Sequence, residues 1–255
     1  MPGVSRLRPR DKGSFAPRRP RKREREEAAR RLTWYAVRVR VVVCDVGVGN
    51  LRSVERALLE AARESGALDR TAVEVTRDPA RLGGADALVM PGQGGFGDCA
   101  RALSGALGDA VREHLAKERP YLGICLGLQV LFESSEEAPG CAGLGVLAGK
   151  VVKLRGGVDA FTGAPLKIPH TGWNQADPTE NRGLLRAGGA AGGEHFYFVH
   201  SFVVAPSDPA VVAATTEYGE RFVSAVAYGN VFACQFHPEK SQRAGLSLLQ
   251  RFLAS

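Results

Sequence analysis

The sequence predicts an α/β fold in which a mostly parallel sheet is flanked by helices and antiparallel strands are added in the C-terminal half. In the first half of the chain, short apolar runs alternate with amphipathic helical segments, an order that favours parallel strands joined by helical crossovers. Beyond about residue 145, short strand candidates are instead separated by Gly, Pro and Asn. A final amphipathic segment, residues 241–253, predicts a C-terminal helix.

The periodicity of apolar side chains predicts each element in turn. Residues 37–44 alternate Val with Arg and end in an apolar run, which indicates a first strand. Apolar residues recur at helical spacing over 51–63, and Ser65-Gly66 ends that helix. Further strands are predicted at 72–76 and 87–90, and a helix at 98–118. The later strands are predicted at 150–154, 196–204, 211–215, 222–228 and 231–236.

The positive charge of the chain is concentrated at its N-terminus. Residues 1–40 contain 14 Lys and Arg against 4 Asp and Glu, whereas residues 41–255 contain 20 against 23. Residues 1–36 are rich in Arg and Pro and poor in large apolar side chains, so we expect a disordered basic extension followed by one domain over 37–255. The extension could be a nucleic-acid tail, a transit peptide, a contact for an acidic partner or incidental upstream sequence.

The cysteine content favours a reducing compartment. Five cysteines, an odd number at no metal-binding spacing, argue against a disulfide framework. No apolar run is long enough for a transmembrane helix, and the N-terminus lacks the apolar segment of a secretory signal. We therefore expect a cytoplasmic protein with no metal or cofactor.

The segment Gly123-Ile124-Cys125-Leu126-Gly127 follows an apolar run and precedes apolar residues at helical spacing. A nucleophile between two glycines at a strand-to-helix turn is held in a strained conformation, with its side chain in open space. The start of the helix favours a thiolate there. The alternative is that Cys125 is a small buried apolar residue.

A base and an acid for this nucleophile lie near the C-terminus. His237 follows a predicted strand, and Pro238 stiffens the link to Glu239. A thiol that attacks a carbonyl needs a base for its proton and a third group that orients the base. The alternative is that His237 caps a turn and Glu239 begins the last helix.

The Gly-rich loop after strand 87–90 is suited to stabilising an anion. Residues 91–97 read Pro-Gly-Gln-Gly-Gly-Phe-Gly, and the glycines leave backbone N–H groups free to face a developing oxyanion. A phosphate-binding loop is the competing interpretation, but the segment lacks the Gly-Lys-Ser/Thr ending and fits a dinucleotide fingerprint poorly.

Together, the Gly-Ile-Cys-Leu-Gly elbow, the His-Pro-Glu segment and the Pro-Gly-x-Gly loop resemble the class I (triad-type) glutamine amidotransferases over nearly all of residues 37–255. Other segments resemble the glutaminase subunits of imidazole glycerol phosphate synthase, from histidine biosynthesis. These segments are residues 45–53, 168–174, 197–202 and 235–241. Anthranilate, GMP and carbamoyl-phosphate synthase glutaminases share the elbow and His-x-Glu, but are not associated with the Pro-His-x-Gly-Trp-Asn segment.

The resemblance implies a flavodoxin-like sheet and a reaction shared between two proteins. This subunit would hydrolyse L-glutamine to glutamate and ammonia. A separate (β/α)8-barrel cyclase subunit would use the ammonia to form imidazole glycerol phosphate and aminoimidazole carboxamide ribotide. Because 255 residues leave no room for a barrel of about 250 residues, a heterodimer is expected, with no nucleic-acid or membrane partner.

The resemblance also implies roles for individual residues. Cys125 would be the nucleophile, His237 the general base and then acid, and Glu239 the orienting carboxylate. The oxyanion hole would be formed by the backbone around Gly92, Gln93, Gly94 and Leu126. The substrate-binding residues would be Gln129, Glu137, His200 and Ser201, with Glu137 on the substrate ammonium. The alternative for Gln129 and Glu137 is that they are exposed polar residues. Trp173 and Asn174 would face the partner.

Two departures from the family pattern bear on the site. Gln93 stands where a small apolar residue such as Val is expected, and Cys44-Asp45-Val46 replaces a more usual Ile-Asp-Tyr. Gln93 is expected to alter basal glutaminase activity or its activation. Two further classes of protein compete with this interpretation: a stand-alone cysteine hydrolase such as a γ-glutamyl hydrolase, and a non-catalytic protein that retains the fold.

Overall fold

The computed structural model describes residues 22, 38–158, 162–180, 183–185 and 193–255. By its internal contacts the chain divides into residues 1–37 and residues 38–255. The predicted disordered extension, residues 1–36, lies outside the described residues except for Lys22. The description below concerns residues 38–255.

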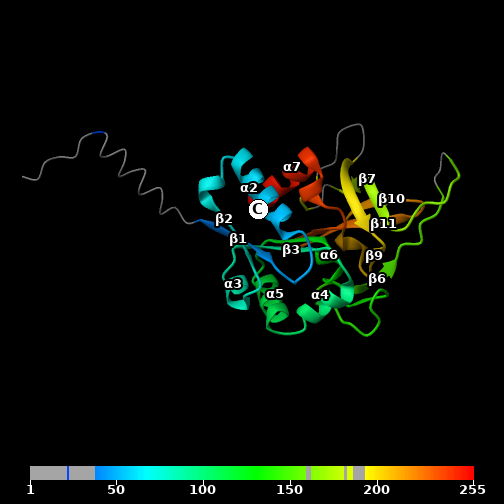
Figure 1. The fold of residues 1–255 in the computed structure, drawn as a ribbon, viewed down its shortest axis with the longest axis horizontal. Coiled ribbons are helices and arrows are strands. Elements are labelled where there is room, and N and C mark those ends of the chain that lie inside the picture. Colours follow the sequence, from blue (N-terminus) through cyan, green and yellow to red (C-terminus); the bar gives the residue numbers. More distant parts are fainter. Residues whose placement is uncertain (1–21, 23–37, 159–161, 181–182, 186–192) are drawn as a thin grey trace, which may run out of the picture. The chain divides into compact units, whose positions relative to one another are not determined.

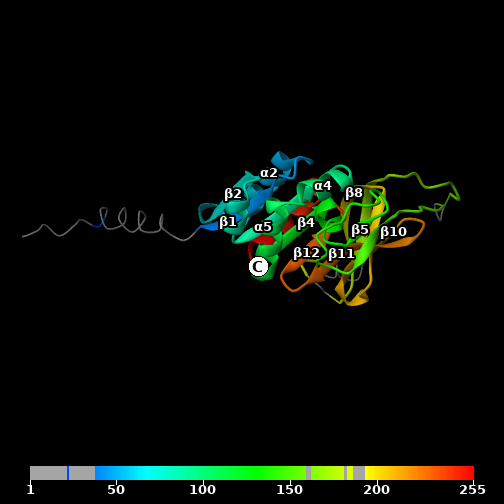
Figure 2. The same cartoon turned by 90° about the horizontal axis from the view of Figure 1, so that it is seen from below.

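Parallel strands form one half of the sheet, in the order β2-β1-β3-β4-β12 (Figures 1 and 2). They are β1 Val39–Cys44, β2 Thr71–Thr76, β3 Ala87–Gly92, β4 Tyr121–Cys125 and β12 Val231–Cys234. This is the strand order of flavodoxin-like sheets. Gly92 is paired with Cys125 and Ile124 with Cys234, so the carboxyl ends of β3, β4 and β12 lie at one edge. The predicted fold class is therefore confirmed.

Helices cover both faces of this half of the sheet. Helices α2 Leu51–Glu64 and α7 Gln242–Leu253 pack together on one face, and α3 Pro79–Gly83, α4 Phe96–Ala102 and α5 Ala106–Ala116 lie on the other (Figures 1 and 2). Two of them begin at side-chain caps, because Asn50 accepts from the Ser53 N–H and Asp78 from the Ala80 N–H.

The predicted helix over 98–118 is wrong in one respect, because it is broken into α4 and α5. Gly105 between them is extended, with φ −131° and ψ −150°. The chain then turns so sharply that a Cβ on Gly108 would lie 1.8 Å from the Leu103 carbonyl oxygen. Apolar residues at helical spacing on both sides of the break hid it from the sequence.

The second half of the sheet is antiparallel, as predicted. Its strands are β6 Gly149–Lys153, β7 His170–Pro178, β8 Glu194–His200, β9 Phe202–Pro206, β10 Val212–Glu217 and β11 Arg221–Tyr228. The short β5 Ser134–Ser135 pairs with β6 in parallel. The predicted strand 196–204 is two strands, β8 and β9, which bend at Ser201 and pair with different neighbours. Strand β7 was not predicted, and β12 ends at Cys234 rather than 236.

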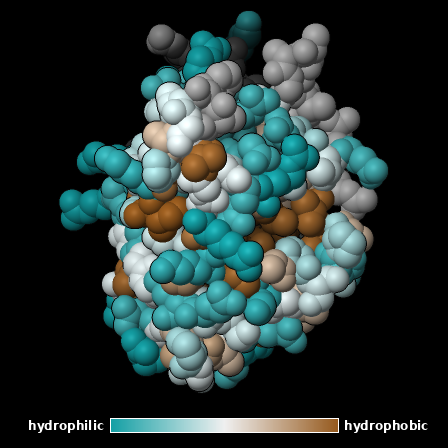
Figure 3. All heavy atoms as spheres, turned by 90° about the vertical axis from the view of Figure 1, so that its right-hand side faces the viewer, coloured by the Kyte–Doolittle hydropathy of each residue, from teal (hydrophilic) through white to brown (hydrophobic). Residues whose placement is uncertain are grey.

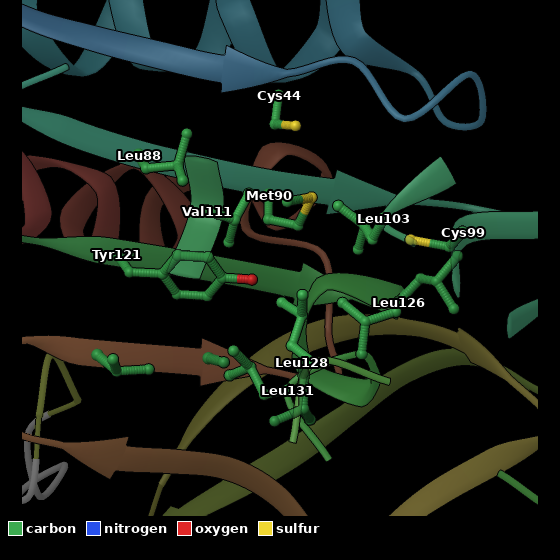
Figure 4. Close-up of a cluster of buried hydrophobic side chains, with 14 of the residues drawn as sticks. Cys44, Leu88, Met90, Cys99, Leu103, Val111, Tyr121, Leu126, Leu128 and Leu131 are labelled. Atoms are coloured by element: carbon green, nitrogen blue, oxygen red, sulfur yellow. The ribbon is translucent and has the colours of Figure 1, made fainter. Parts of the chain in front are cut away.

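The core is packed in two clusters, one on each face of the sheet. Figure 4 shows part of one, where Tyr121 lies among Leu88, Met90 and Val111 with its hydroxyl toward Leu126 and Leu128. On the face drawn in Figure 3, hydrophobic residues reach the surface in separate patches between hydrophilic ones. Within the described part of the chain, none of the helices has the length and apolarity needed to cross a membrane.

Candidate active site

Cys125 occupies a strained turn between β4 and helix α6, Leu126–Gln129. Its backbone has φ 54° and ψ −100°, a conformation that L-residues rarely adopt. The flanking glycines are required by close packing, because a Cβ on Gly127 would lie 1.8 Å from the Met90 carbonyl oxygen and one on Gly123 would lie 2.5 Å from that of Gly127. The Tyr121 hydroxyl donates a hydrogen bond of 2.9 Å to the Gly127 carbonyl and so braces the turn.

His237 and Glu239 form a buried pair beside this turn. After β12 ends, the His237 N–H donates to the Tyr197 carbonyl, and the Ser241 hydroxyl donates to the His237 carbonyl. Both bonds hold the short 3-10 turn Pro238–Lys240 in place. His237 Nδ1 lies 2.9 Å from Glu239 Oε1, and the two side chains are 1% and 3% exposed. A histidine that only caps a turn would not need this buried side-chain bond to Glu239.

The environment of His237 favours its protonated form. Burial lowers the pKa of the imidazole, but hydrogen bonding to Cys125 and to Glu239, together with their charges, outweighs burial and raises the pKa to about 9. Because Nδ1 is bonded to Glu239, the interaction with Cys125 falls to the buried Nε2 of His237. The geometry therefore leaves Nε2 available to exchange a proton with the sulfur or a ligand.

Three of the other cysteines are set apart from Cys125 by their burial. Burial raises the pKa of Cys44 and of Cys99 to about 12 and that of Cys234 well above its ordinary value. Their thiols stay protonated at neutral pH and are poor nucleophiles. All five cysteines are free, and Cys141 is half-buried outside this site.

A cavity of about 360 Å³ opens over Cys125. It is lined by Gln93, Gly94, Cys125, Leu126, Gln129, Glu137, Pro169, Val199, His200, Ser201, Phe202 and Lys240. Every residue predicted for the oxyanion hole or for substrate binding therefore lines this one cavity, with the exception of Gly92. Gly92 lies just behind it, where a Cβ would be 2.6 Å from the Leu126 Cβ.

The loop that contains Gln93 touches the catalytic pair directly. The Gln93 amide nitrogen lies 3.5 Å from His237 Nδ1, and Gly94 has φ 149°, a value suited to glycine. A small apolar residue at position 93 would not reach the imidazole. The departure from the family pattern at this position therefore has a physical consequence inside the site.

Gln129 and Glu137 reach the cavity in different ways. Gln129 is buried, with 4% of its surface exposed, so the alternative of an exposed polar residue is wrong for it. Glu137 is exposed, but its carboxylate accepts a hydrogen bond of 2.9 Å from the Phe96 N–H at the start of α4. Glu137 therefore joins the cavity wall to the end of the Gly-rich loop.

His200 belongs to a buried chain of hydrogen bonds. Asn174 Nδ2 donates to His170 Nε2 (3.3 Å), His170 Nδ1 lies 3.1 Å from His200 Nε2, and His200 Nδ1 lies 3.1 Å from the Phe202 carbonyl. This arrangement satisfies both rings as neutral imidazoles. Burial lowers the pKa of His170 to about 4 and that of His200 to about 3.

Because both nitrogens of His200 are engaged, any contact of His200 with a ligand falls to its main chain or its ring carbons. Asn174 likewise points inward, to His170 and the Glu217 carbonyl, so of the predicted partner-facing pair only Trp173 is exposed, at 49%. His114 is buried against the Pro120 carbonyl and His195 is exposed, in agreement with the absence of any motif around them.

Two polar residues of the site were missed by sequence reasoning. Lys240 lines the cavity, with its ammonium 5.7 Å from the centre of the Tyr197 ring. Gln235 is fully buried, and its amide nitrogen lies 3.4 Å from Cys125 Sγ. Both flank the His-Pro-Glu segment, but neither residue type indicates by itself what its side chain contacts. Within the described ranges, no group of three or more His, Cys, Asp and Glu is arranged to hold a metal ion.

Comparison with known proteins gives the chain its relatives. Residues 42–255 match the family described as "Glutamine amidotransferase class-I". The "Imidazole glycerol phosphate synthase subunit HisH" of Methylococcus capsulatus is 47% identical over 84% of this chain and 95% of its own length. The protein of the same name from Chromobacterium violaceum is 47% identical over 85% and 98%. A solved structure titled "Structure of PurLQS from Thermotoga maritima" has the same fold, with a TM-score of 0.61 at 19% identity over 84% of this chain and 97% of that one.

Proposed function

Because the chain belongs to the class-I glutamine amidotransferases and, within them, to the subunits of imidazole glycerol phosphate synthase, we propose that it hydrolyses L-glutamine through Cys125, His237 and Glu239 and passes the ammonia to a cyclase subunit in histidine biosynthesis. The observation that carries this proposal is the convergence of a strained Cys125 and a buried His237–Glu239 pair at the same strand ends, under one cavity.

The chemistry follows from the side chains. The Cys125 sulfur attacks the γ-carboxamide carbon of glutamine, and His237 carries the proton from the thiol to the leaving nitrogen. Ammonia departs, and a γ-glutamyl thioester remains on Cys125. His237 then takes a proton from water, which attacks the thioester and releases glutamate. Glu239 holds the imidazole in the required tautomer through its bond to Nδ1.

The tetrahedral intermediates carry a negative oxygen that needs N–H donors. The backbone N–H groups of Leu126, directly after the nucleophile, and of the loop Gly92–Gly94 would supply them, and Leu126 and Gly94 line the cavity. One such donor is often worth about 2.7–4 kcal/mol of barrier lowering. Glu137 and Gln129 supply oxygen acceptors on the cavity wall for the substrate ammonium.

The proposed partner is a (β/α)8-barrel cyclase that docks next to this cavity. Trp173 on β7 is half exposed and stacks edge-to-face on Tyr197 of β8, with ring centres 6.2 Å apart. Lys240 lies over the same tyrosine and also lines the cavity. Exposed aromatic residues such as Trp and Tyr are enriched at interface centres. The five free cysteines support a reducing, cytoplasmic setting for the pair.

The test combines the full chain with a (β/α)8 cyclase subunit and the nucleotide substrate of the cyclase. We expect L-glutamine to support product formation. Cys125→Ala should abolish this reaction while ammonium salts still support it, and Cys141→Ala, a cysteine outside the site, should behave as the unchanged chain. Glutamine-dependent turnover that persists in Cys125→Ala would refute the assignment of the nucleophile.

Two other outcomes would favour the competing classes. Strong glutaminase or peptidase turnover without any partner would indicate a stand-alone cysteine hydrolase. Failure of Cys125 to react with an alkylating glutamine analogue, in a folded protein, would indicate a non-catalytic one.

A further inference from the structure

Gln235 reaches Cys125 from the end of β12. It is fully buried and follows the last residue of β12. Its backbone N–H donates a 2.8 Å hydrogen bond to the Ser224 carbonyl of β11. This bond extends the pairing of the two strands by one residue, so the side chain leaves the sheet in a fixed direction.

The amide of Gln235 connects the nucleophile to a cavity residue. Its nitrogen donates to Cys125 Sγ at 3.4 Å, and its oxygen accepts from Gln129 Nε2 at 3.2 Å. The Gln129 nitrogen also donates to the Phe202 carbonyl, at 3.1 Å. Turning the Gln235 amide around would place two NH2 groups face to face, so the bonds of Gln129 fix which end of Gln235 points at the sulfur.

We propose that Gln235 is a further catalytic residue, which donates a hydrogen bond to the Cys125 thiolate and orients Gln129 for the substrate. The second part rests on the proposed function, whereas the first does not.

A buried thiolate requires such a donor. Cys125 is only 8% exposed, so water solvates its sulfur poorly. An N–H bond to a charged acceptor is about twice as strong as one to a neutral acceptor, so the contact with Gln235 favours the thiolate over the thiol. His237 supplies charge on one side of the sulfur, and Gln235 supplies a second, uncharged donor that cannot lose its proton.

The same bonds determine what Gln129 offers to a ligand. Its nitrogen contacts two acceptors, Phe202 O and Gln235 Oε1, which occupy its two N–H groups. The oxygen of Gln129 is then the atom left for a ligand, and it accepts hydrogen bonds only. A donor such as the substrate ammonium fits this position.

The other ionisable groups near the sulfur are known from the structure. His237 and Cys234 interact electrostatically with Cys125, and Glu239 lies behind His237. Glu137 and Lys240 line the cavity farther along. The effect of substituting Gln235 on the ionisation of Cys125 must therefore be measured with His237 and Glu239 unchanged. Both variants described below keep these two residues.

The experiment measures alkylation of Cys125 by iodoacetamide against pH in the full chain without a partner, read by mass spectrometry of the peptide that carries Cys125. Gln235→Met removes the donor at similar volume, and we expect the midpoint to rise by about one pH unit, with about tenfold slower alkylation at pH 7. Gln235→Glu, which keeps the shape, should raise it at least as much. In the complex with the cyclase, both should lower kcat at least about tenfold.

Matched variants separate the two roles. Gln129→Met should raise KM for glutamine and raise the alkylation midpoint by less than Gln235→Met does, because the amide that donates to the sulfur is kept. Gln250→Met, which changes a glutamine on the surface of α7 bonded to Glu64, should change neither quantity. In the unchanged chain, the side-chain amide resonances of Gln235 should shift with the same midpoint as alkylation.

An unchanged midpoint in Gln235→Glu, or amide resonances that do not respond to Cys125 ionisation, would overturn the proposal. Alkylation reports on Cys125 whether or not glutamine is hydrolysed. A failure of the proposed function would therefore leave the alkylation shift in place, whereas a failure of this proposal would leave glutamine turnover intact.

Discussion

The two buried histidines beside the cavity make the stability of the protein sensitive to acid. The pKa of His170 is lowered to about 4 and that of His200 to about 3, in each case chiefly by burial. In the unfolded chain both would titrate near pH 6.5. Their contribution to the free energy of unfolding is therefore complete above about pH 6.5. It is lost as the pH falls, because the unfolded chain then binds protons that the folded chain does not.

We expect the free energy of unfolding, measured by urea titration, to fall below pH 6.5 by up to about 1.4 kcal/mol per pH unit for each of these histidines. His170→Phe can keep the stacking on Phe198 and Tyr218. It should reduce this slope by up to about 1.4 kcal/mol per pH unit, the share of one titrating histidine. His195→Gln, at an exposed site, should not change it. A slope that His170→Phe leaves unaltered would contradict the assignment.

His237 acts in the opposite direction at high pH. Its pKa is raised to about 9 despite burial, because of Cys125 and Glu239, so its contribution is complete below about pH 6.5 and is lost as the pH rises through 9. The two kinds of histidine together place the maximum of stability near neutral pH.

At the scale of residues, the sequence predicted the reactive groups but not the amides that serve them. Cys125, His237 and Glu239 belong to types with acid–base chemistry and each follows a predicted strand, so their convergence could be anticipated. Gln235 and Asn174 have no such signature, because an amide side chain gains its role only from the atoms it meets. The inward direction of Asn174 depends on the pairing of β7 with β8, which the sequence did not predict.

At the scale of elements, the elbow depends on a bond that closes across it. The Tyr121 hydroxyl is buried and donates to the Gly127 carbonyl. Tyr121→Phe would leave that carbonyl without its donor inside the core. We expect a loss of about 1–3 kcal/mol in the free energy of unfolding, together with a lower kcat because the turn that holds Cys125 is less constrained. Urea titration and the coupled assay measure the two effects.

Tyr228→Phe is the matched control for this change, because Tyr228 is 60% exposed. It should alter neither stability nor turnover. Equal stability of Tyr121→Phe and the unchanged chain would show that the hydroxyl does not brace the turn.

The break between α4 and α5 predicts opposite outcomes for two nearby glycines. Gly108→Ala would place a methyl group 1.8 Å from the Leu103 carbonyl oxygen, so the turn must move, at a cost of about 1–3 kcal/mol or more. Gly105→Ala has open space around its Cβ and φ −131°, so it should be neutral or stabilise by about 0.4–1 kcal/mol. Thermal and urea unfolding of both variants make the comparison. Similar effects at the two positions would favour one continuous helix.

The elements that the sequence missed are those set by long-range contacts. The parallel strands carry strong apolar runs and were located to within about two residues, the usual uncertainty of boundaries. Strand β7 contains Gly172, Trp173 and Asn174, and its pattern gives little β signal. It exists because it pairs with β8 along most of its length.

At the scale of the whole molecule, the sheet brings together residues that are far apart in the chain. Gln93, Cys125 and His237 lie at or just beyond the carboxyl ends of β3, β4 and β12. These strands are adjacent in the sheet, although β12 lies over a hundred residues from β4 in the sequence. The antiparallel half supplies His200 and Ser201 from the bend between β8 and β9. One active site therefore depends on both halves of the sheet, and variants that unfold either half should abolish activity.

The N-terminal basic segment is expected to be dispensable for this arrangement. Both hydrophobic clusters are built from residues between Val41 and Phe252, and the family match begins at residue 42. We predict that deletion of residues 1–35 leaves the melting temperature and the glutamine-dependent activity with a cyclase subunit unchanged within about twofold, since it removes none of the residues of these two clusters. Deletion of residues 1–44 is the matched control: it removes β1 from between β2 and β3, and the chain should not fold. A chain that begins at Ala36, folds normally and has lost activity would show that the basic segment takes part in catalysis or in binding the partner.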